Sequence, residues 1–207
     1  MKYIKKAVEP EVLSDFKINY RNDCGNEATY NKITTIVKNK LKSELLKEQF
    51  YICCYCMNRV TQINSHIEHV KPQSKFPKET LDYGNLLVSC NGIQDRNENC
   101  GHKKTNWFNE AEFITPLNPD CERIFTYSLA GEMDSTERNG KITIAKLNLN
   151  SFLLVRARKA AIYSSGLFEP DFSIKKQEMI DYFTIPNSDN ELPQFCMTVM
   201  YCVNNYS

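Results

Sequence analysis

The spacing of hydrophobic and polar positions changes from segment to segment along the chain. Residues 1–27 are mixed, and they end in the turn-like stretch RNDCGNE. From Thr29 to Phe50 the apolar residues recur at helical spacing, and lysines cover much of the remaining surface. This pattern predicts an amphipathic helix. Its basic side is either a solvated face or a surface that contacts phosphates.

The middle of the chain is built from shorter runs. The stretch FYICCYCMNRVTQINSHIEHVKPQS mixes apolar and β-branched residues in short pieces, which predicts two short strands with tight turns. The stretch FPKETLDYGNLLVSCNG starts as a loop and ends in a short apolar run. The polar stretch DRNENCGHKKTNWFNE then predicts a loop that leads into a helix.

The second half of the chain predicts both strands and helices. Between residues 113 and 150, RIFTYS and GKITIAKLNL have β-like patterns and are separated by the turn ERNG. SFLLVRARKAAIYSSG predicts a helix that ends at Gly166, and FSIKKQEMIDYF predicts another. The tail from Leu192, LPQFCMTVMYCVNNYS, is apolar, so we expect it to pack against the rest of the protein.

These elements predict an α+β protein in three parts. They are an N-terminal segment with the basic helix (1–50), a central core (51–110) and a mixed α/β C-terminal part (111–207). A chain of 207 residues with 42% hydrophobic and 25% charged residues can bury a core of its own. The apolar runs are too short to span a membrane, and MKYIKKAVEPEV has no apolar signal region. We therefore expect a cytoplasmic protein.

Charge divides the chain into a basic half and an acidic half. The formal net charge is +1, which excludes a global basic field. Residues 1–107 nevertheless carry 17 Lys and Arg against 12 Asp and Glu, while residues 108–207 carry 9 against 13. The first half could therefore bind nucleic acid, and the acidic, apolar-ended C-terminal half is the candidate docking region for a partner.

Nine cysteines are many for a reducing compartment, where clustered thiols bind metal more often than they form disulfides. Cys53 and Cys56 have the spacing of a zinc knuckle, and Cys90 and Cys100 supply a second pair. They predict a structural four-cysteine zinc site, with four unrelated buried thiols as the alternative. Cys54 competes with Cys53 as a ligand, although its spacing to Cys56 is less suitable. The scattered cysteines are expected to be small buried hydrophobic residues; these are Cys24, Cys121, Cys196 and Cys202.

The stretch SHIEHVKP holds two of the three histidines of the chain around a glutamate. Four thiolates fill a structural zinc site, so Glu68 and His69 remain free for chemistry. A carboxylate suits a hard divalent cation, and an imidazole can take a proton from water near neutral pH. On a strand, His66 and Glu68 would share a face, and His69 would join them only if the strand curls. We interpret His66 as a bystander.

The order of these motifs resembles the HNH nuclease family with its structural zinc. It runs Cys-x-x-Cys, Glu-His-Val-x-Pro, Asn-Leu, then two cysteines with His-Lys-Lys. Longer stretches are similar to the narrower PtuB group of HNH subunits, which belongs to Septu antiphage systems and related retron systems. They are IEHVKPQSKFPKETLDYGNLLVSCNG, CGHKK, FITPLNPDCERIFTYSLAGEM and LNLNSFLLVRARKAA. The resemblance covers residues 1–165 and implies a ββα-metal (His-Me finger) core around one catalytic Mg²⁺ or Mn²⁺.

The resemblance also implies a role for each motif residue. His69 would be the general base that activates water, and Glu68 the first ligand of the catalytic metal. Asn85 would brace the loop and help to orient the base. The second metal ligand falls at or near His102. The sequence departs from the common pattern there, because Gly101 precedes His102 and the spacing of the second cysteine pair is stretched. Asn91 and Asn106 are therefore weaker, alternative candidates.

Two lysines and two aromatic residues follow the last cysteine of the motif. Lys103 and Lys104 could meet substrate phosphates as point charges. Trp107 and Phe108 are interpreted as core residues and less readily as a stacking platform for bases.

The function predicted from these features is a metal-dependent HNH endonuclease, with DNA as the favoured substrate. The resemblance implies a defence complex with an ABC/SMC-like ATPase subunit of the PtuA type. In retron forms it implies a reverse transcriptase with its multicopy DNA. One alternative is a non-catalytic zinc module that binds nucleic acid or protein. Another is a nuclease for RNA such as tRNA, because the motif addresses a phosphodiester and no base edge.

Overall fold

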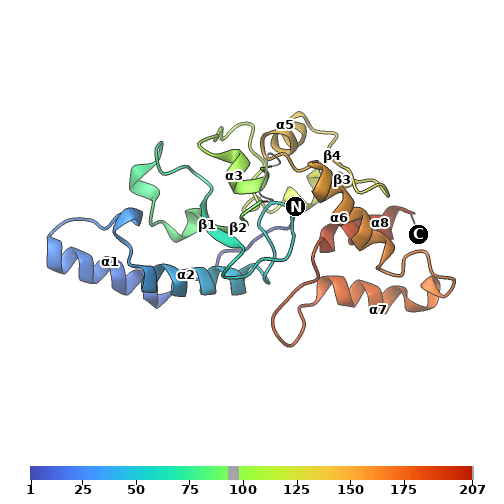
Figure 1. The fold of residues 1–207 in the computed structure, drawn as a ribbon, viewed down its shortest axis with the longest axis horizontal. Helices are drawn as coiled ribbons and strands as arrows, with labels where there is room; N and C mark the ends of the chain where they lie inside the picture. The colour runs from blue at the N-terminus through green and yellow to red at the C-terminus, as the bar shows by residue number, and fades with distance from the viewer. Residues whose placement is uncertain (93–97, 207) are drawn as a thin grey trace.

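A two-stranded antiparallel sheet lies at the centre of the molecule and carries the SHIEH stretch. Strand β1 (Ser65–His69) pairs with β2 (Leu86–Cys90) in the register Ser65↔Cys90 to His69↔Leu86. Helix α3 (Cys100–Lys104) follows β2 and packs on it (Figure 1). The computed structural model describes residues 1–92 and 98–206, so residues 93–97 of the predicted loop lie outside the described residues. The chain therefore runs strand, strand, helix through the predicted motif.

Two long helices form the N-terminal arm beside the sheet. These are α1 (Glu11–Cys24) and α2 (Thr35–Glu48), with a 3-10 turn, η1 (Tyr30–Lys32), between them (Figure 1). The predicted helix therefore starts later than Thr29: Thr34 caps α2 by accepting a hydrogen bond from the Val37 N–H. Helix α1 was not predicted from the mixed pattern of residues 1–27. It buries only Leu13, so its sequence has no apolar period to detect.

The loop between the two strands contains two 3-10 turns, η2 (Pro77–Glu79) and η3 (Tyr83–Asn85). Before β1 in the sequence, the first of the two predicted short strands is present only as an isolated bridge between Ile52 and Arg59. This bridge closes the turn that holds Cys53 and Cys56. The short strands expected here are thus present as one strand and one bridge.

The C-terminal half is mostly helical. Its elements are α4 (Cys121–Ile124), β3 (Thr126–Tyr127), β4 (Met133–Asp134), α5 (Arg138–Lys146), α6 (Phe152–Tyr163), α7 (Phe172–Thr184) and α8 (Cys196–Tyr206). The helices expected at α6 and α7 are confirmed, and β3 lies within the predicted RIFTYS strand. Among residues 1–92 and 98–206, none of the helices is both long and apolar enough to cross a membrane.

The strand predicted in GKITIAKLNL is wrong, because this segment forms helix α5. Its buried residues are Gly140, Thr143 and Ile144, which follow the three-and-four spacing of a helix face. Gly140 lets the helix approach Ser135 so closely that an added Cβ would overlap that side chain. The alternating isoleucine and threonine residues imitate a strand, but this packing decides the structure.

The apolar tail packs into the core, as expected. Helix α8 contacts α6, α7 and β3, and Val199, Cys202 and Val203 are fully buried. The chain before α8 is also tied to the central part, since the Phe195 N–H donates to the Met57 carbonyl at 2.9 Å. Deleting residues 167–207 would therefore uncover the core. The three-part division of the chain stays a prediction.

The scattered cysteines differ in their surroundings. Cys121, Cys196 and Cys202 are buried, which confirms the expectation for them. Cys24 is exposed, so the expectation for it is wrong. It lies in the last turn of α1, just before Gly25 ends that helix in the left-handed conformation at φ 69°.

Candidate active site and cysteine cluster

Four buried thiols meet beside the sheet. The Sγ atoms of Cys53, Cys56, Cys90 and Cys100 all lie within 4.8 Å of one another. They come from the knuckle turn, the end of β2 and the start of α3, so the cluster joins three segments that are far apart in the sequence. The prediction that these four cysteines meet is confirmed. Cys54, the competing candidate, is buried but lies outside the group.

The backbone around the cluster prepares it for thiolates. The Cys90 N–H donates to the Cys53 sulfur at 3.3 Å, as backbone amides do in zinc knuckles. Burial opposes ionisation of Cys53, but hydrogen bonds from Cys100, Cys54 and Cys56 outweigh it and lower the pKa of Cys53 well below its ordinary value. Four thiols at this spacing have the donor set and the burial of a structural zinc site.

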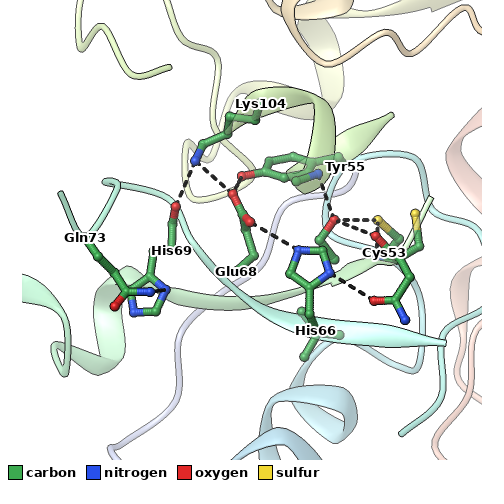
Figure 2. A network of polar contacts seen from close by, with 12 residues as sticks. Cys53, Tyr55, His66, Glu68, His69, Gln73 and Lys104 are labelled. Atoms are coloured by element: carbon green, nitrogen blue, oxygen red, sulfur yellow. Dashed lines mark hydrogen bonds and ion pairs between the residues drawn. The ribbon is translucent and has the colours of Figure 1, made fainter. Parts of the chain in front are cut away.

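Glu68 is a buried carboxylate at the centre of a polar network (Figure 2). Its Oε1 accepts a hydrogen bond from the Tyr55 hydroxyl at 3.1 Å and pairs with the Lys104 amino group at 2.8 Å. Its Oε2 lies 3.4 Å from Nε2 of His66. Burial alone would raise the pKa of Glu68, but His66 and Lys104 outweigh it, so the pKa is lowered. The carboxylate is therefore ionised at neutral pH.

Lys104 differs from the expectation that it meets substrate phosphates. Its side chain is 1% exposed, and its amino group also donates to the His69 carbonyl at 2.9 Å. The cause is its place on α3, three residues after Gly101, where the helix faces the sheet and turns this side chain inward. Lys104 thus holds Glu68 and the end of β1, whereas Lys103 is exposed.

His69 stands at the end of β1 and its ring has a fixed tautomer. Its Nε2 lies 3.0 Å from the Thr80 carbonyl oxygen, which can only accept, so Nε2 carries the hydrogen. Its Nδ1 is then an acceptor and lies 3.4 Å from the side-chain nitrogen of Gln73. The Tyr30 ring contacts the imidazole edge-on, with 4.6 Å between centroids. Burial lowers the pKa of His69, against the Thr80 hydrogen bond, so the ring is neutral near pH 7.

Asn85 ties the two ends of the loop between the strands. Its Oδ1 accepts from the Lys71 N–H at 2.7 Å, and its Nδ2 donates to the carbonyls of Lys71 and Glu79 at 3.1 and 3.0 Å. Thr80, whose carbonyl holds His69, is the next residue after Glu79. Asn85 therefore supports His69 through the loop and makes no hydrogen bond to the imidazole itself.

His66 and His102 lie next to each other, and His66 faces the Glu68 oxygen that Lys104 does not bind. Their ring centroids are 4.5 Å apart, and Nδ1 of His66 lies 3.1 Å from Oδ1 of Asn91. Figure 2 shows Glu68 pointing from the strand toward Lys104, while His69 points toward Gln73. Asn106, the other weaker candidate for a metal ligand, is exposed. The network therefore brings Glu68, His66 and His102 into one group.

Two exposed lysines lie on the helices that contact the sheet, Lys38 on α2 and Lys103 on α3. The amino group of Lys38, an exposed residue of α2, lies 4.7 Å from the centroid of the same Tyr30 ring that contacts His69. Lys103 is exposed on α3. Trp107 and Phe108 pack against Phe113, with ring centroids 5.0 and 6.2 Å away, as expected for core residues.

Sequence reasoning missed several residues of the site. Tyr55 lies between two zinc-knuckle cysteines, and nothing in its position signals that its hydroxyl reaches Glu68. Gln73 follows the proline of the motif and is a polar loop residue by pattern alone. The contact of Asn91 was also not predicted: Asn91 is a weaker candidate for a metal ligand, but its Oδ1 accepts a hydrogen bond from His66.

The chain is similar in sequence to three curated proteins. No family model matches it. It is 28% identical to the candidate HNH endonuclease of retron Vc95 from Vibrio cholerae serotype O1 biovar El Tor, over 61% of this chain and 65% of that protein. It is 26% identical to the candidate HNH endonuclease of retron Ec83 from Escherichia coli, over 79% and 80%. It is 27% identical to the Septu protein PtuB from Bacillus thuringiensis, over 72% and 55%.

The resemblance to the HNH endonucleases is confirmed. All three relatives are modest in identity, yet each carries the name of an HNH endonuclease or of the Septu protein PtuB. The chain spans less than two thirds of the length of the Vibrio and Bacillus proteins it matches. The chain is thus similar to proteins named as HNH endonucleases and to the Septu protein PtuB.

Proposed function

We propose that this protein is a cation-dependent HNH endonuclease that hydrolyses phosphodiester bonds of nucleic acid, with DNA as the favoured substrate. The observation that carries the proposal is the state of His69. Its Nε2 is held by the Thr80 carbonyl, so the basic lone pair lies on Nδ1, which faces the side-chain nitrogen of Gln73 at 3.4 Å. A neutral imidazole with a fixed tautomer is what a general base requires.

The local architecture supports this function. Strand β1, strand β2 and helix α3 follow one another in the order of the ββα-metal core, and they bring Glu68, His69 and Asn85 to one region. We propose that the four-cysteine cluster binds a structural Zn²⁺ that fixes the start of α3 against the end of β2. A closed thiolate site of this kind contributes to folding and takes no part in the chemistry.

Glu68 has the chemistry of a ligand for the catalytic cation. Its Oε2 faces His66 and the first turn of α3, where His102 is the second candidate ligand. These residues fit Mg²⁺ or Mn²⁺, because they offer a buried anionic oxygen with imidazole nitrogen nearby. When bound, such a cation stabilises the charge that develops on the phosphate and the leaving oxygen.

The residues of the chain supply the remaining steps. Nδ1 of His69 takes a proton from the attacking water, while the Thr80 carbonyl stabilises the positive charge that the imidazole acquires. Asn85 keeps Thr80 in place through the loop. Lys103 on α3 and Lys38 on α2 are exposed cations that would contact the phosphates beside the scissile bond. By family resemblance the products carry a 5′-phosphate and a 3′-hydroxyl.

We also propose that the protein works as the effector subunit of a Septu-type defence complex. The Bacillus relative is named a Septu protein, and the two others are named as parts of retrons. The partner implied by the resemblance is an ABC/SMC-like ATPase of the PtuA type, together with a reverse transcriptase and multicopy DNA in retron forms. A net charge of +1 agrees with a nuclease that relies on a partner to hold nucleic acid.

The experiment that tests this function is cleavage by the purified full chain. Supercoiled plasmid and total RNA are incubated with the protein in Mg²⁺ or Mn²⁺, alone and with an ATPase of the PtuA type. His69→Ala is the inactive variant, and Asn205→Ala on the exposed end of α8 is the matched control. We expect nicking or linearisation that His69→Ala abolishes and Asn205→Ala retains. Cleavage of RNA in place of plasmid would favour the tRNA-type alternative.

The competing function is a zinc module that binds without cleaving. The presence of Glu68 and His69 argues against it, because a binding module needs neither a buried carboxylate nor a neutral imidazole with a fixed tautomer. Full biological activity of His69→Ala, with zinc still bound at one equivalent, would favour this alternative and contradict the nuclease.

A further inference from the structure

His66 lies beside Glu68 as a consequence of strand geometry. Residues two apart on a strand share a face, and Nε2 of His66 is 3.4 Å from Oε2 of Glu68. The His66 side chain is 29% exposed, whereas that of Glu68 is 8% exposed. The pair therefore spans the boundary between the buried network and solvent, where a cation with bound water can enter.

The tautomer of His66 is fixed by Asn91. The amide nitrogen of Asn91 donates to the Ile63 carbonyl at 3.3 Å, so its Oδ1 is the atom that faces His66. That oxygen lies 3.1 Å from Nδ1 of His66 and can only accept, so Nδ1 carries the hydrogen. In the neutral ring, the lone pair of Nε2 then points at the Glu68 carboxylate. Two acceptors that face each other need a proton or a cation between them.

This arrangement has the second contact that metal-binding histidines usually make. A histidine that ligates a metal through one nitrogen donates its other N–H to an oxygen, which sets the tautomer and the ring orientation. Asn91 supplies that oxygen to His66. On the opposite side of the sheet, His69 uses its N–H for Thr80 and keeps Nδ1 for proton transfer, so the two histidines are prepared for different tasks.

Gly101 opens α3 toward the same pair of atoms. A Cβ at this position would lie 2.5 Å from Oε2 of Glu68 and 2.6 Å from Nε2 of His66. Any side chain at residue 101 would fill the space between the helix and the pair. Gly101 has no side chain that could bind a cation. It leaves space for a ligand from β1, such as His66. The His102 ring stands next to His66 at the solvent edge of this space.

We propose that His66 is a ligand of the catalytic cation, which it binds through Nε2 together with Glu68, with His102 at the outer edge of the site. This inference rests on the proposed function and adds a residue to its metal site. The strand supplies the nitrogen that α3 cannot supply at Gly101. Asn91 is a positioning residue that orients the His66 ring.

The ligand set also predicts which cation is preferred. Carboxylate and water suit Mg²⁺, whereas imidazole nitrogen shifts affinity toward transition metals. A site with Glu68 and one or two imidazoles should bind Mn²⁺ more tightly than Mg²⁺. Replacing His66 by glutamine removes an imidazole nitrogen and leaves the Glu68 carboxylate. Because Mn²⁺ gains more from the nitrogen than Mg²⁺ does, the substitution should weaken the binding of Mn²⁺ more.

The test measures cation binding directly on the full-length, zinc-loaded chain. Free Mn²⁺ is followed by its EPR signal during titration, and pulsed EPR detects the ¹⁴N coupling of a bound imidazole. His66→Gln, Asn91→Ala and Glu68→Gln are compared with the wild type, and Asn205→Ala, on the exposed end of α8, is the control. Zinc content and circular dichroism show that each variant is folded.

We expect one Mn²⁺ site in the wild type. His66→Gln should weaken it about ten-fold or more and reduce the ¹⁴N coupling, Asn91→Ala should weaken it less, and Asn205→Ala should leave it unchanged. Unchanged or tighter Mn²⁺ binding by His66→Gln, with binding lost in Glu68→Gln, would overturn the role of His66 alone and leave only an ion pair with Glu68. No Mn²⁺ binding by the folded wild type would overturn both this inference and the cation-dependent nuclease.

Discussion

Asn85→Ala removes the side chain that closes the loop between the two strands. The residue is 4% exposed, and its amide makes three hydrogen bonds, one from the Lys71 N–H and two to the carbonyls of Lys71 and Glu79. Alanine keeps the backbone contacts of residue 85, including the bond from the Val70 N–H to its carbonyl at 3.1 Å. The substitution therefore isolates the contribution of the amide.

The expected cost follows from these three bonds. A net contribution of about 1 kcal/mol for each gives a loss of about 3 kcal/mol in the free energy of unfolding. Since Glu79 directly precedes Thr80, a loose loop also releases the carbonyl that orients His69. Misplacing a catalytic group by about 1 Å can lower kcat about 100-fold, so we expect a loss of activity larger than the loss of stability implies.

Two measurements check this prediction. Urea unfolding of the zinc-loaded protein gives the stability change, and hydrogen exchange locates it in residues 70–85. Asn205→Ala, which removes one exposed bond to the Tyr201 carbonyl, is the matched control and should cost less than about 0.5 kcal/mol. Asn85→Asp keeps an acceptor for Lys71 but sets a carboxylate against two carbonyls, so it should not restore activity. A cost below about 1 kcal/mol together with normal cleavage would contradict the role of the Asn85 amide in holding the loop and His69.

Three further predictions concern the zinc cluster, the buried ion pair and the base. Cys56→Ala should lose the bound zinc and unfold the core, whereas Cys54→Ala should keep one equivalent; zinc analysis with circular dichroism checks both, and retained zinc in Cys56→Ala would contradict the cluster. Lys104→Met should cost about 3–5 kcal/mol in urea unfolding by leaving Glu68 buried without its cation, and Glu68→Gln in the same chain should recover part of that loss. The pKa of His69 is lowered from 6.5, so the neutral imidazole persists as the pH falls through 6.5. At saturating Mn²⁺, the acid limb of the pH profile of kcat should therefore lie below 6.5. An acid limb above 7 would exclude His69 as the base.

Features set by local sequence could be predicted, and those set by packing could not. The four clustered cysteines could be identified because the Cys53–Cys56 spacing is that of a chelating pair. The helices α6 and α7 carry their own apolar period and end signals. Helix α5 was assigned as a strand because the close approach of Gly140 to Ser135 is a tertiary contact that the pattern of its isoleucines does not contain.

The site shows the same division. Glu68 and His69 could be chosen as candidates from the sequence, because they are adjacent residues and their side chains suit cation binding and proton transfer. The inward turn of Lys104 and the convergence of His66 on Gly101 depend on how α3 packs against the sheet, which the sequence does not reveal. For that reason the pattern indicates neither the contact of His66 with Glu68 nor the burial of Lys104.

The central claim is that His69 is the general base of phosphodiester hydrolysis, and chemical rescue tests it most directly. His69→Gly removes a side chain that is 7% exposed and leaves a cavity of imidazole shape. Plasmid cleavage in Mn²⁺ is measured with and without added free imidazole, beside the zinc content and Mn²⁺ binding of the variant. We expect His69→Gly to show almost no cleavage without imidazole and a dose-dependent recovery with it, because free imidazole can replace the missing base. Undiminished cleavage by His69→Gly, or no recovery in a variant that is folded and binds both metals, would contradict it.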